Sequence, residues 1–267
     1  VGRLFGGAYQ EPAVVPAERP RYGGLNLMNH LDGACARFGW CHLRLRPHLL
    51  ERCTFSFGDS VLEPEDVGVA GAMEPVLAGL LESTMRTGSA LGRAGVDVFR
   101  LVGFLLDQRP AGPGRVLDDY IEAQIHAVIR LSADVEAIVL DPSFRDTPTA
   151  RILSRDAARR GIAVEWHSGS VLALSGIPTE APAGAGGELA LWQAFCGGGR
   201  AARLGRVVME RCSVEGVHLD AAAIGRASAS AIREPERWRE WGSAAELQQL
   251  LKYLWLILLA HGGTPGA

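Results

Sequence analysis

The stretch Tyr120-Ile121-Glu122-Ala123-Gln124-Ile125-His126 decides how the rest of the chain is interpreted. Successive side chains of a β-strand point to opposite faces. One face of this strand would be an ordinary apolar core row, and the other would carry Tyr120, Glu122, Gln124 and His126. A solvated face typically shows Lys, Glu and Thr, whereas this one has an acid, an amide, an imidazole and a phenol. We therefore predict that Glu122 is a catalytic carboxylate.

Composition indicates a globular chain. It has 267 residues, of which 48% are hydrophobic and 21% charged, enough for one large domain or a domain with an appendage. The net charge of -3 and the lack of a basic stripe give no reason to expect a nucleic-acid or membrane partner. The longest apolar run, residues 253–260, is too short to span a bilayer, which predicts a soluble protein. Five cysteines, an odd number, indicate free thiols in a reducing compartment, and no signal peptide is visible.

The first half of the chain predicts strands and a few helices. Residues 1–20 contain three prolines and are expected to form an extended arm. Residues 21–26 are expected to enter the fold as a short strand, in which Gly23 and Gly24 permit close backbone approach. We predict a helix over residues 27–38 and strands over residues 41–46 and 49–57.

In the second half of the chain, a mixture of helices and strands is predicted to give way to helices alone. Helices are expected over residues 73–85 and 96–106, which together would form a helical insertion at about 73–109. A further helix is expected over residues 147–160, and strands at 135–140 and 162–166. The Pro- and Gly-rich residues 179–187 predict a linker. Beyond it every element is predicted helical, at residues 189–195, 201–211, 221–232 and 247–259. Ser243 and Glu246 are spaced as a capping box for the last of these.

Five ordered segments resemble a bacterial ADP-ribosyltransferase family, typified by an effector that mono-ADP-ribosylates ubiquitin on a threonine. They are Arg21-Tyr22-Gly23-Gly24-Leu25-Asn26, Asp32-Gly33, Arg37-Phe38-Gly39, Arg52-Cys53-Thr54-Phe55-Ser56-Phe57-Gly58-Asp59-Ser60 and Tyr120 to His126. The resemblance covers most of residues 20–167. It implies an α+β fold: a split β-sandwich with flanking helices as catalytic domain at residues 21–178, followed by a helical region at 188–267.

The resemblance also implies the site and the reaction. NAD would be the substrate, with no metal, and ADP-ribose would pass to a protein side chain, plausibly a threonine of ubiquitin. It implies catalytic roles for Glu122 and for an aspartate, either Asp59 or its rival Asp119. The implied NAD-binding residues are Arg21, Tyr22, Gly23, Arg52, Thr54, Phe55, Ser56 and Gln124. As a bacterial effector or toxin, the protein would act in the bacterial cytoplasm or after delivery into a host cell.

These roles agree with general chemistry. Cleavage of the nicotinamide–ribose bond develops an oxocarbenium ion, which a fixed carboxylate stabilises. Thr54 and Ser56 would floor the ribose site, and Phe55, Phe57 or Tyr22 would stack on the nicotinamide ring. Either Arg21 or Arg52 would hold the diphosphate, because guanidinium groups suit bidentate oxyanion contacts. Gln124 stands where arginine-modifying enzymes of this type have a second Glu, so an arginine acceptor is not expected.

Two other classes of function remain open. Six possible zinc ligands fall within residues 30–53, namely His30, Cys35, Cys41, His42, His48 and Cys53. They lack the close pairs, such as Cys-x2-Cys, that zinc sites use, and a Cys–His nucleophile pair is equally without a motif. The second alternative is a non-catalytic module that binds a protein through the aromatic residues of the helical region, such as Trp238, Trp241, Tyr253 and Trp255.

Overall fold

A computed structural model describes residues 4–107, 119–178, 199–214 and 216–265, and shows a mixed α+β protein. The chain divides into two compact units. The first comprises Val1–Leu140 and Arg151–His167, and the second Asp141–Ala150 and Ser168–Ala267. Each unit has a hydrophobic core of its own. The predicted linker at residues 179–187 and the predicted helix at 189–195 lie outside the described residues.

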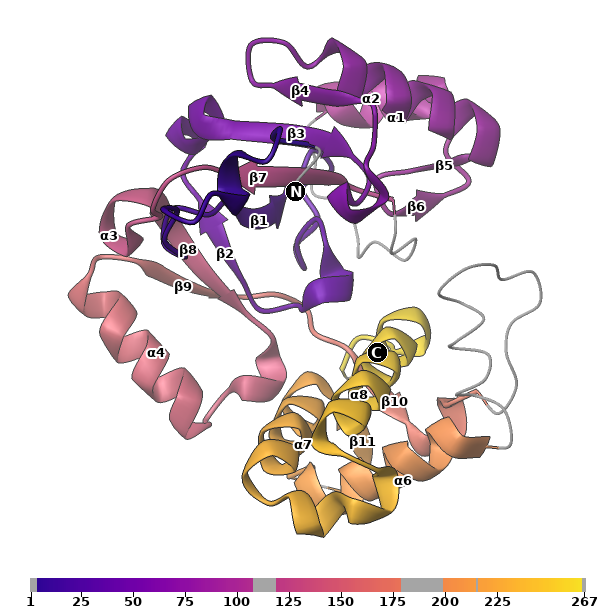
Figure 1. Cartoon of the computed structure of the whole chain (residues 1–267). Coiled ribbons are helices and arrows are strands. Elements are labelled where there is room, and N and C mark those ends of the chain that lie inside the picture. Colours follow the sequence, from indigo (N-terminus) through magenta and orange to yellow (C-terminus); the bar gives the residue numbers. More distant parts are fainter. Residues whose placement is uncertain (1–3, 108–118, 179–198, 215, 266–267) are drawn as a thin grey trace. The chain divides into compact units, whose positions relative to one another are not determined.

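The main sheet of the first unit is built around the stretch that contains Glu122. Its strands, in spatial order, are β1 (Arg21–Gly24), β7 (Ile121–Ile125), β3 (Cys53–Phe57) and β4 (Val67–Val69), and each pairs antiparallel with its neighbours. Figure 1 shows β7 between β1 and β3. All five residues of β7 are buried, which confirms the predicted strand and makes it a central one.

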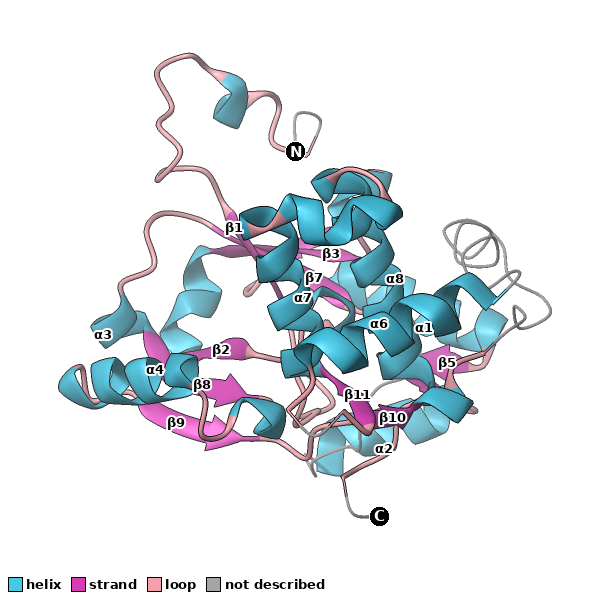
Figure 2. Ribbon diagram, turned by 90° about the horizontal axis from the view of Figure 1, so that it is seen from below, coloured by secondary structure: helices cyan, strands magenta, loops and turns pink. Residues whose placement is uncertain are grey.

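A second sheet of the same unit contains β2 (His42–Leu45), β8 (Val135–Leu140) and β9 (Ala163–Trp166), in that order. Its three strands lie in a row in Figure 2, with β8 and β9 parallel and β2 antiparallel to β8. The short helix α3 (Leu131–Asp134) leads into β8, and α4 (Pro148–Arg159) connects β8 to β9. Ala157 of α4 packs on Val135 and Ile162 in a small core cluster.

The core of the first unit lies between the main sheet and two helices. These are α1 (Glu74–Thr87) and α2 (Val98–Asp107), joined by the hairpin of β5 (Ser89–Ala90) and β6 (Arg93–Ala94). Phe55 of β3 and Ile121 of β7 pack with Leu80 and Leu101 of the helices. The apolar periodicity of residues 73–85 and 96–106 thus predicted both helices, each to within two residues at either end.

The predicted helix at residues 27–38 is wrong. This segment consists of turns followed by a single 3₁₀ turn, Ala36–Phe38. The Asn26 side chain accepts from the His30 backbone N–H at 2.9 Å and donates to the His30 carbonyl at 2.8 Å, so it occupies groups that a helix would use. Gly33 then takes a left-handed conformation with φ of 89°. Local side-chain hydrogen bonds therefore override the apolar spacing.

The predicted strand at residues 49–57 begins later than expected. Pro47–Arg52 forms a 3₁₀ turn with proline at its start, and β3 begins only at Cys53. The fixed φ of proline favours such a helical turn. Arg52 therefore lies at the end of a turn rather than within a strand.

The second unit packs three helices around one core. They are α6 (Arg200–Cys212), α7 (Ala221–Arg233) and α8 (Ala244–His261), and Trp238 of the intervening 3₁₀ turn Pro235–Trp241 is buried among them. The capping box of Ser243 and Glu246 is confirmed. The expectation of helices alone is wrong, because β10 (Val171–Ala173) pairs with β11 (His218–Asp220). β11 has only three residues, too few for a visible alternation.

No helix among the described residues is long and apolar enough to cross a lipid bilayer.

Candidate functional site

Glu122 lies at the centre of the main sheet, with small residues on both sides. It is opposite Gly24 of β1 and opposite Ser56 of β3. Directly opposed residues of antiparallel strands share a face, so neither neighbour covers the carboxylate with a large side chain. The Glu122 side chain is buried but retains 6% exposure. The carboxylate is therefore held within the sheet and is still reached from one side.

Two donors orient the Glu122 carboxylate. Gln124 Nε2, two residues along the same strand, donates to Glu122 Oε1 at 2.7 Å and to Ser56 Oγ at 3.0 Å. The backbone N–H of Ser60 lies 3.4 Å from Glu122 Oε2. Both Gln124 and Ser56 have no measurable exposure. These buried polar groups satisfy one another, as buried polar groups must, and fix the carboxylate.

A chain of hydrogen bonds runs from this carboxylate to the N-terminal arm. Thr54 Oγ1 donates to Gln124 Oε1 at 2.9 Å and lies 3.1 Å from His126 Nε2. Because the Thr54 proton is already used, His126 must donate from Nε2 and accept at Nδ1 from the Tyr9 hydroxyl, 2.6 Å away. Burial lowers the pKa of His126, which favours this neutral tautomer. All donors of the chain then point toward Glu122.

Glu122 opens into a cleft of about 1000 Å³ within the first unit. Its walls come from β1, from residues between 32 and 45 including β2, and from residues 59–61 and 120–131. The cleft therefore lies where the main sheet approaches the edge strand of the second sheet. Its size is at the upper end of the range for small-molecule sites.

Asp59 is one of two aspartates that line the cleft beside Glu122, the other being Asp32. It directly follows the β3–Gly58 segment, and its Oδ1 accepts from the Val61 N–H at 2.9 Å, capping the 3₁₀ turn Ser60–Leu62. The rival Asp119 is not among the residues that line this cleft and lies against Ser89 and Leu91 instead, where burial raises its pKa. Of Asp59 and Asp119, the structure brings Asp59 together with Glu122.

Three carboxyl residues, Asp32, Asp59 and Glu122, line the cleft together with Arg21. Burial, and then the charge of Glu122, raise the pKa of Cys35 to about 12. Burial is also the larger cause of the raised pKa of Tyr22, again with a contribution from Glu122. Tyr120 has a raised pKa through burial and the charge of Asp59, among others. The thiol and both phenols therefore stay neutral.

Arg21 and Tyr22 both line the cleft. Tyr22 is 49% exposed, so its ring is accessible. Arg21 Nη1 donates to the backbone carbonyls of Pro16 at 3.2 Å and Arg19 at 2.8 Å, and the guanidinium is exposed. Gly23 also contributes to the wall.

Five residues predicted to bind the cofactor are not among those that line the cleft: Arg52, Thr54, Phe55, Ser56 and Gln124. Thr54, Ser56 and Gln124 lie behind Glu122 in the hydrogen-bond chain. Phe55 faces the other side of the sheet and is a core residue with 1% exposure. Arg52 forms an ion pair with Asp134 at 2.8 Å. Three of the five thus support Glu122 from behind, whereas Phe55 belongs to the core and Arg52 to an ion pair.

Sequence reasoning gave no ligand-binding role to several residues of the cleft wall, among them Phe38, Cys35 and Ser60. Phe38 is 63% exposed and its ring meets that of Tyr120 edge-on, with centroids 6.0 Å apart. Cys35 was considered only as a metal ligand, and the Ser60 N–H is a backbone group that no side-chain pattern reveals. The residues lie on turns, so only the fold brings them to the cleft.

Four of the six possible zinc ligands have separate partners. His30 Nε2 lies 2.7 Å from the Leu91 carbonyl oxygen, and His48 Nε2 lies 3.0 Å from Asp134 Oδ1. Cys53 Sγ donates to the Leu49 carbonyl, and His42 Nδ1 lies 2.9 Å from that of Trp40. Within the described ranges, no group of three or more His, Cys, Asp or Glu side chains is placed to hold a metal ion.

Comparison with known families places the chain in one of them. A family model described as "Protein of unknown function (DUF3626)" matches residues 2–261, almost the whole chain. A search of curated proteins gave no significant match.

Proposed function

Since the chain belongs to the DUF3626 family, which carries no assigned function, we propose from the chemistry of its cleft that the protein is a mono-ADP-ribosyltransferase. NAD would be the donor, nicotinamide the leaving group and a protein side chain the acceptor. The observation that carries the proposal is the oriented carboxylate of Glu122 at the base of a cleft large enough for a dinucleotide.

The proposed reaction breaks the bond between the nicotinamide nitrogen and ribose C1′. Nicotinamide leaves as a neutral molecule with the bonding electron pair, and positive charge develops on the ribose. The acceptor oxygen bonds to C1′, and its proton passes to water. Glu122 would stabilise that charge, because its carboxylate is already fixed by Gln124 and needs no reorganisation. Asp59 would add a second negative charge at the same cleft.

Other residues would bind the rest of NAD. The accessible Tyr22 ring suits stacking on nicotinamide, and the exposed Arg21 suits the diphosphate. The two sheets of the first unit, with the cleft against both, are compatible with a split β-sandwich of the ADP-ribosyltransferase type. The five sequence segments that resemble such a family all belong to this unit.

For the acceptor we propose a threonine of ubiquitin, and for its recognition the second unit or the segment of α1 and α2. Both rest on the family resemblance. Labelled NAD incubated with ubiquitin would test the acceptor, and an unmodified ubiquitin would overturn it.

The test of the activity is nicotinamide release from NAD by the wild type and by Glu122→Gln. Glutamine keeps the size of the side chain and removes its charge, so we expect turnover to fall by roughly 100- to 1000-fold with folding intact. Glu136→Gln, on the exposed side of β8, is the matched control and should leave turnover unchanged. Equal turnover in the wild type and Glu122→Gln would exclude a catalytic role for Glu122, and no turnover in the wild type would favour a non-catalytic binding module.

A further inference from the structure

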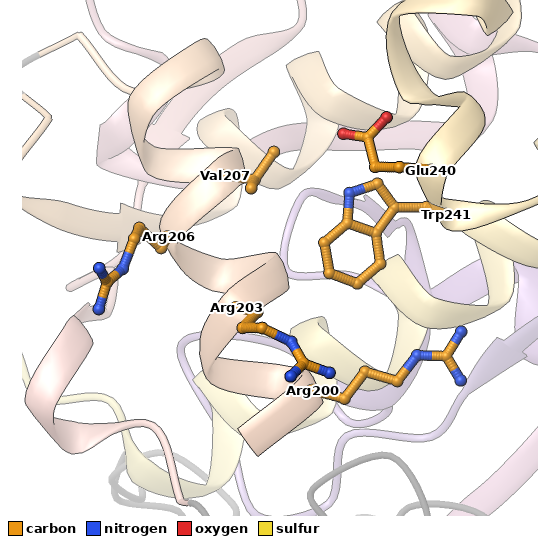
Figure 3. A pocket seen from close by; sticks show the side chains of 6 residues that line it. All are labelled: Arg200, Arg203, Arg206, Val207, Glu240 and Trp241. Atoms are coloured by element: carbon orange, nitrogen blue, oxygen red, sulfur yellow. The ribbon is translucent and has the colours of Figure 1, made fainter. Parts of the chain in front are cut away.

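A separate hollow in the second unit is lined by arginines and a tryptophan. Its volume is about 560 Å³, and Figure 3 shows the side chains that line it: Arg200, Arg203, Arg206, Val207, Glu240 and Trp241. α6 supplies the arginines, and the 3₁₀ turn Pro235–Trp241 supplies the indole ring. None of these residues belongs to the unit that holds the Glu122 cleft.

The three arginines form one row along α6. Residues three apart lie on neighbouring positions of a helix surface, and each step of three advances about 4.5 Å along the axis. All three are exposed, and none makes a hydrogen bond or ion pair with another residue that the structure describes; Arg200 only lowers the pKa of Glu246 through space. The acid of the hollow, Glu240, is paired with Arg211 at 2.9 Å. The row therefore presents positive charge that no ion pair with a described residue neutralises.

This row does not help α6 to fold. Like charges at this spacing repel, and the first turn of the helix has no acidic residue to offset cations near the positive end of the helix dipole. Burial of Leu204 and Val208 holds the helix instead. An anion bound along the row would remove the repulsion.

Trp241 adds a flat apolar surface beside the charges. Its ring is partly buried against the core of the second unit and points into the hollow between Arg203 and Glu240. Gly242, with φ of 96°, ends the turn directly after it. An indole face held in this way can stack on another ring, and guanidinium groups bind phosphate oxygens in pairs.

We propose that this hollow binds a nucleoside di- or triphosphate, with the phosphates along Arg200, Arg203 and Arg206 and the base against Trp241. The volume suits a ligand of this size. The proposal does not rest on the function of the Glu122 cleft.

The experiment is calorimetric titration of the full chain with ADP, pyrophosphate, adenosine and a polyglutamate peptide. We expect ADP to bind to the wild type and at least about tenfold more weakly to Arg203→Gln/Arg206→Gln, since two charge-assisted contacts are lost. Trp241→Leu should weaken ADP several-fold and leave pyrophosphate unchanged. Arg86→Gln/Arg155→Gln, two exposed arginines elsewhere, is the control of equal charge and should bind ADP like the wild type.

Three results would overturn the proposal. Equal ADP affinity in the wild type and Arg203→Gln/Arg206→Gln would place any binding elsewhere, for instance in the Glu122 cleft. A wild type that does not bind ADP would exclude a nucleoside diphosphate as the ligand of the hollow. Polyglutamate that binds as tightly as ADP, with both affinities unchanged in Trp241→Leu, would identify an acidic protein segment instead of a nucleotide.

Discussion

Glu122 owes its orientation to the residues next to it on the sheet. Gln124 reaches back along β7 to donate to it, and Thr54 holds the Gln124 oxygen on the opposite side. The amide thus has a defined direction, because its NH₂ faces the carboxylate and its oxygen faces a hydroxyl. A substitution at Gln124 would leave a buried carboxylate without its shortest donor, so this residue supports the site without touching a ligand.

Exchange of each aspartate for asparagine distinguishes the two candidates for the second carboxylate. Asp59→Asn keeps an oxygen to cap the turn at Val61 and removes the charge from the cleft, so we expect at least about tenfold slower nicotinamide release with little loss of stability. Asp119→Asn should leave turnover unchanged, since that carboxyl does not line the cleft and burial opposes its charge. The opposite ranking of the two variants would identify Asp119 as the catalytic partner.

Tyr9→Phe tests the hydrogen-bond chain at its outer end. Phenylalanine keeps the stacking of the ring on His126, whose centroid lies 5.8 Å away, and removes the hydroxyl that donates to Nδ1. A hydrogen bond to Nδ1 favours the neutral imidazole, so its loss should raise the pKa of His126 toward its ordinary value. An NMR titration of the imidazole measures this, with Tyr253→Phe of the second unit as control. An unchanged pKa would mean that the arm does not make this bond.

At the scale of elements, the approach of the turn at residues 34–35 to β1 closes one wall of the cleft. Gly24 has no Cβ, and a Cβ added there would overlap the Cys35 sulfur and lie 2.9 Å from the Ala34 Cβ. The glycine is therefore required by close packing beside Glu122, its opposite neighbour on the sheet. The paired glycines were predicted to permit a close approach to the backbone. At Gly24 it is the neighbouring turn at residues 34–35 that makes this approach.

Gly24→Ala should consequently disturb both the wall and the fold. We expect a loss of about 1–3 kcal/mol in the free energy of unfolding, typical of overpacking, together with weaker binding of any ligand of the cleft. Gly71→Ala is the control, since a Cβ there meets nothing within 4 Å, and should change stability by less than about 0.5 kcal/mol. Denaturant unfolding of both variants measures the difference. Equal stability of the two variants would show that the turn at residues 34–35 can move away from β1 without a loss of unfolding free energy.

At the scale of the molecule, two cores coexist in one chain, and neither unit is a continuous segment. The second unit takes in Asp141–Ala150, where Ser143 Oγ accepts from the Ala222 N–H at 3.0 Å, and also Ser168–Ala267. A chain cut within residues 179–187 therefore leaves β10 without its partner β11. Point substitutions are the better way to separate the contributions of the two units to activity.

The stability of the first unit should depend on pH through His167. Burial is the larger cause that lowers its pKa to about 4, with a further lowering by His42 that Asp32 opposes. The unfolded chain binds this proton from about pH 6.5 downward while the folded protein does not, so stability is present above pH 6.5 and is lost as the pH falls toward 4. The loss amounts to at most roughly 3 kcal/mol.

Denaturant unfolding of wild type and His167→Gln at several pH values between 4 and 7 measures this contribution. The wild type should lose more stability than the variant over that interval. The difference between the two isolates His167 from Asp119, whose raised pKa acts in the opposite direction. Parallel pH profiles would show that His167 is protonated as easily in the folded protein as in the unfolded chain.

The sequence by itself was sufficient where structure depends on local periodicity. The alternation of residues 120–126 predicted the central strand and its polar face, and apolar spacing with the Ser243 and Glu246 capping box predicted the long helices. These patterns persist because each strand or helix must bury its own apolar side. The helix predicted over residues 27–38 does not form, because the Asn26 side chain bonds to the backbone of His30 and so replaces the hydrogen bonds of a helix.

Only the tertiary structure decided which polar residues reach the cleft and which stand behind it. Thr54, Ser56 and Glu122 all lie on the polar face of an alternating strand sequence. The neighbouring strands nevertheless enclose Thr54 and Ser56 in a hydrogen-bond chain and leave Glu122 open to the cleft. The two arginines likewise differ through residues distant in sequence. Arg52 forms an ion pair with Asp134, whereas Arg21 lines the cleft. Pairing across strands and the packing of turns are long-range, so no local pattern contains them.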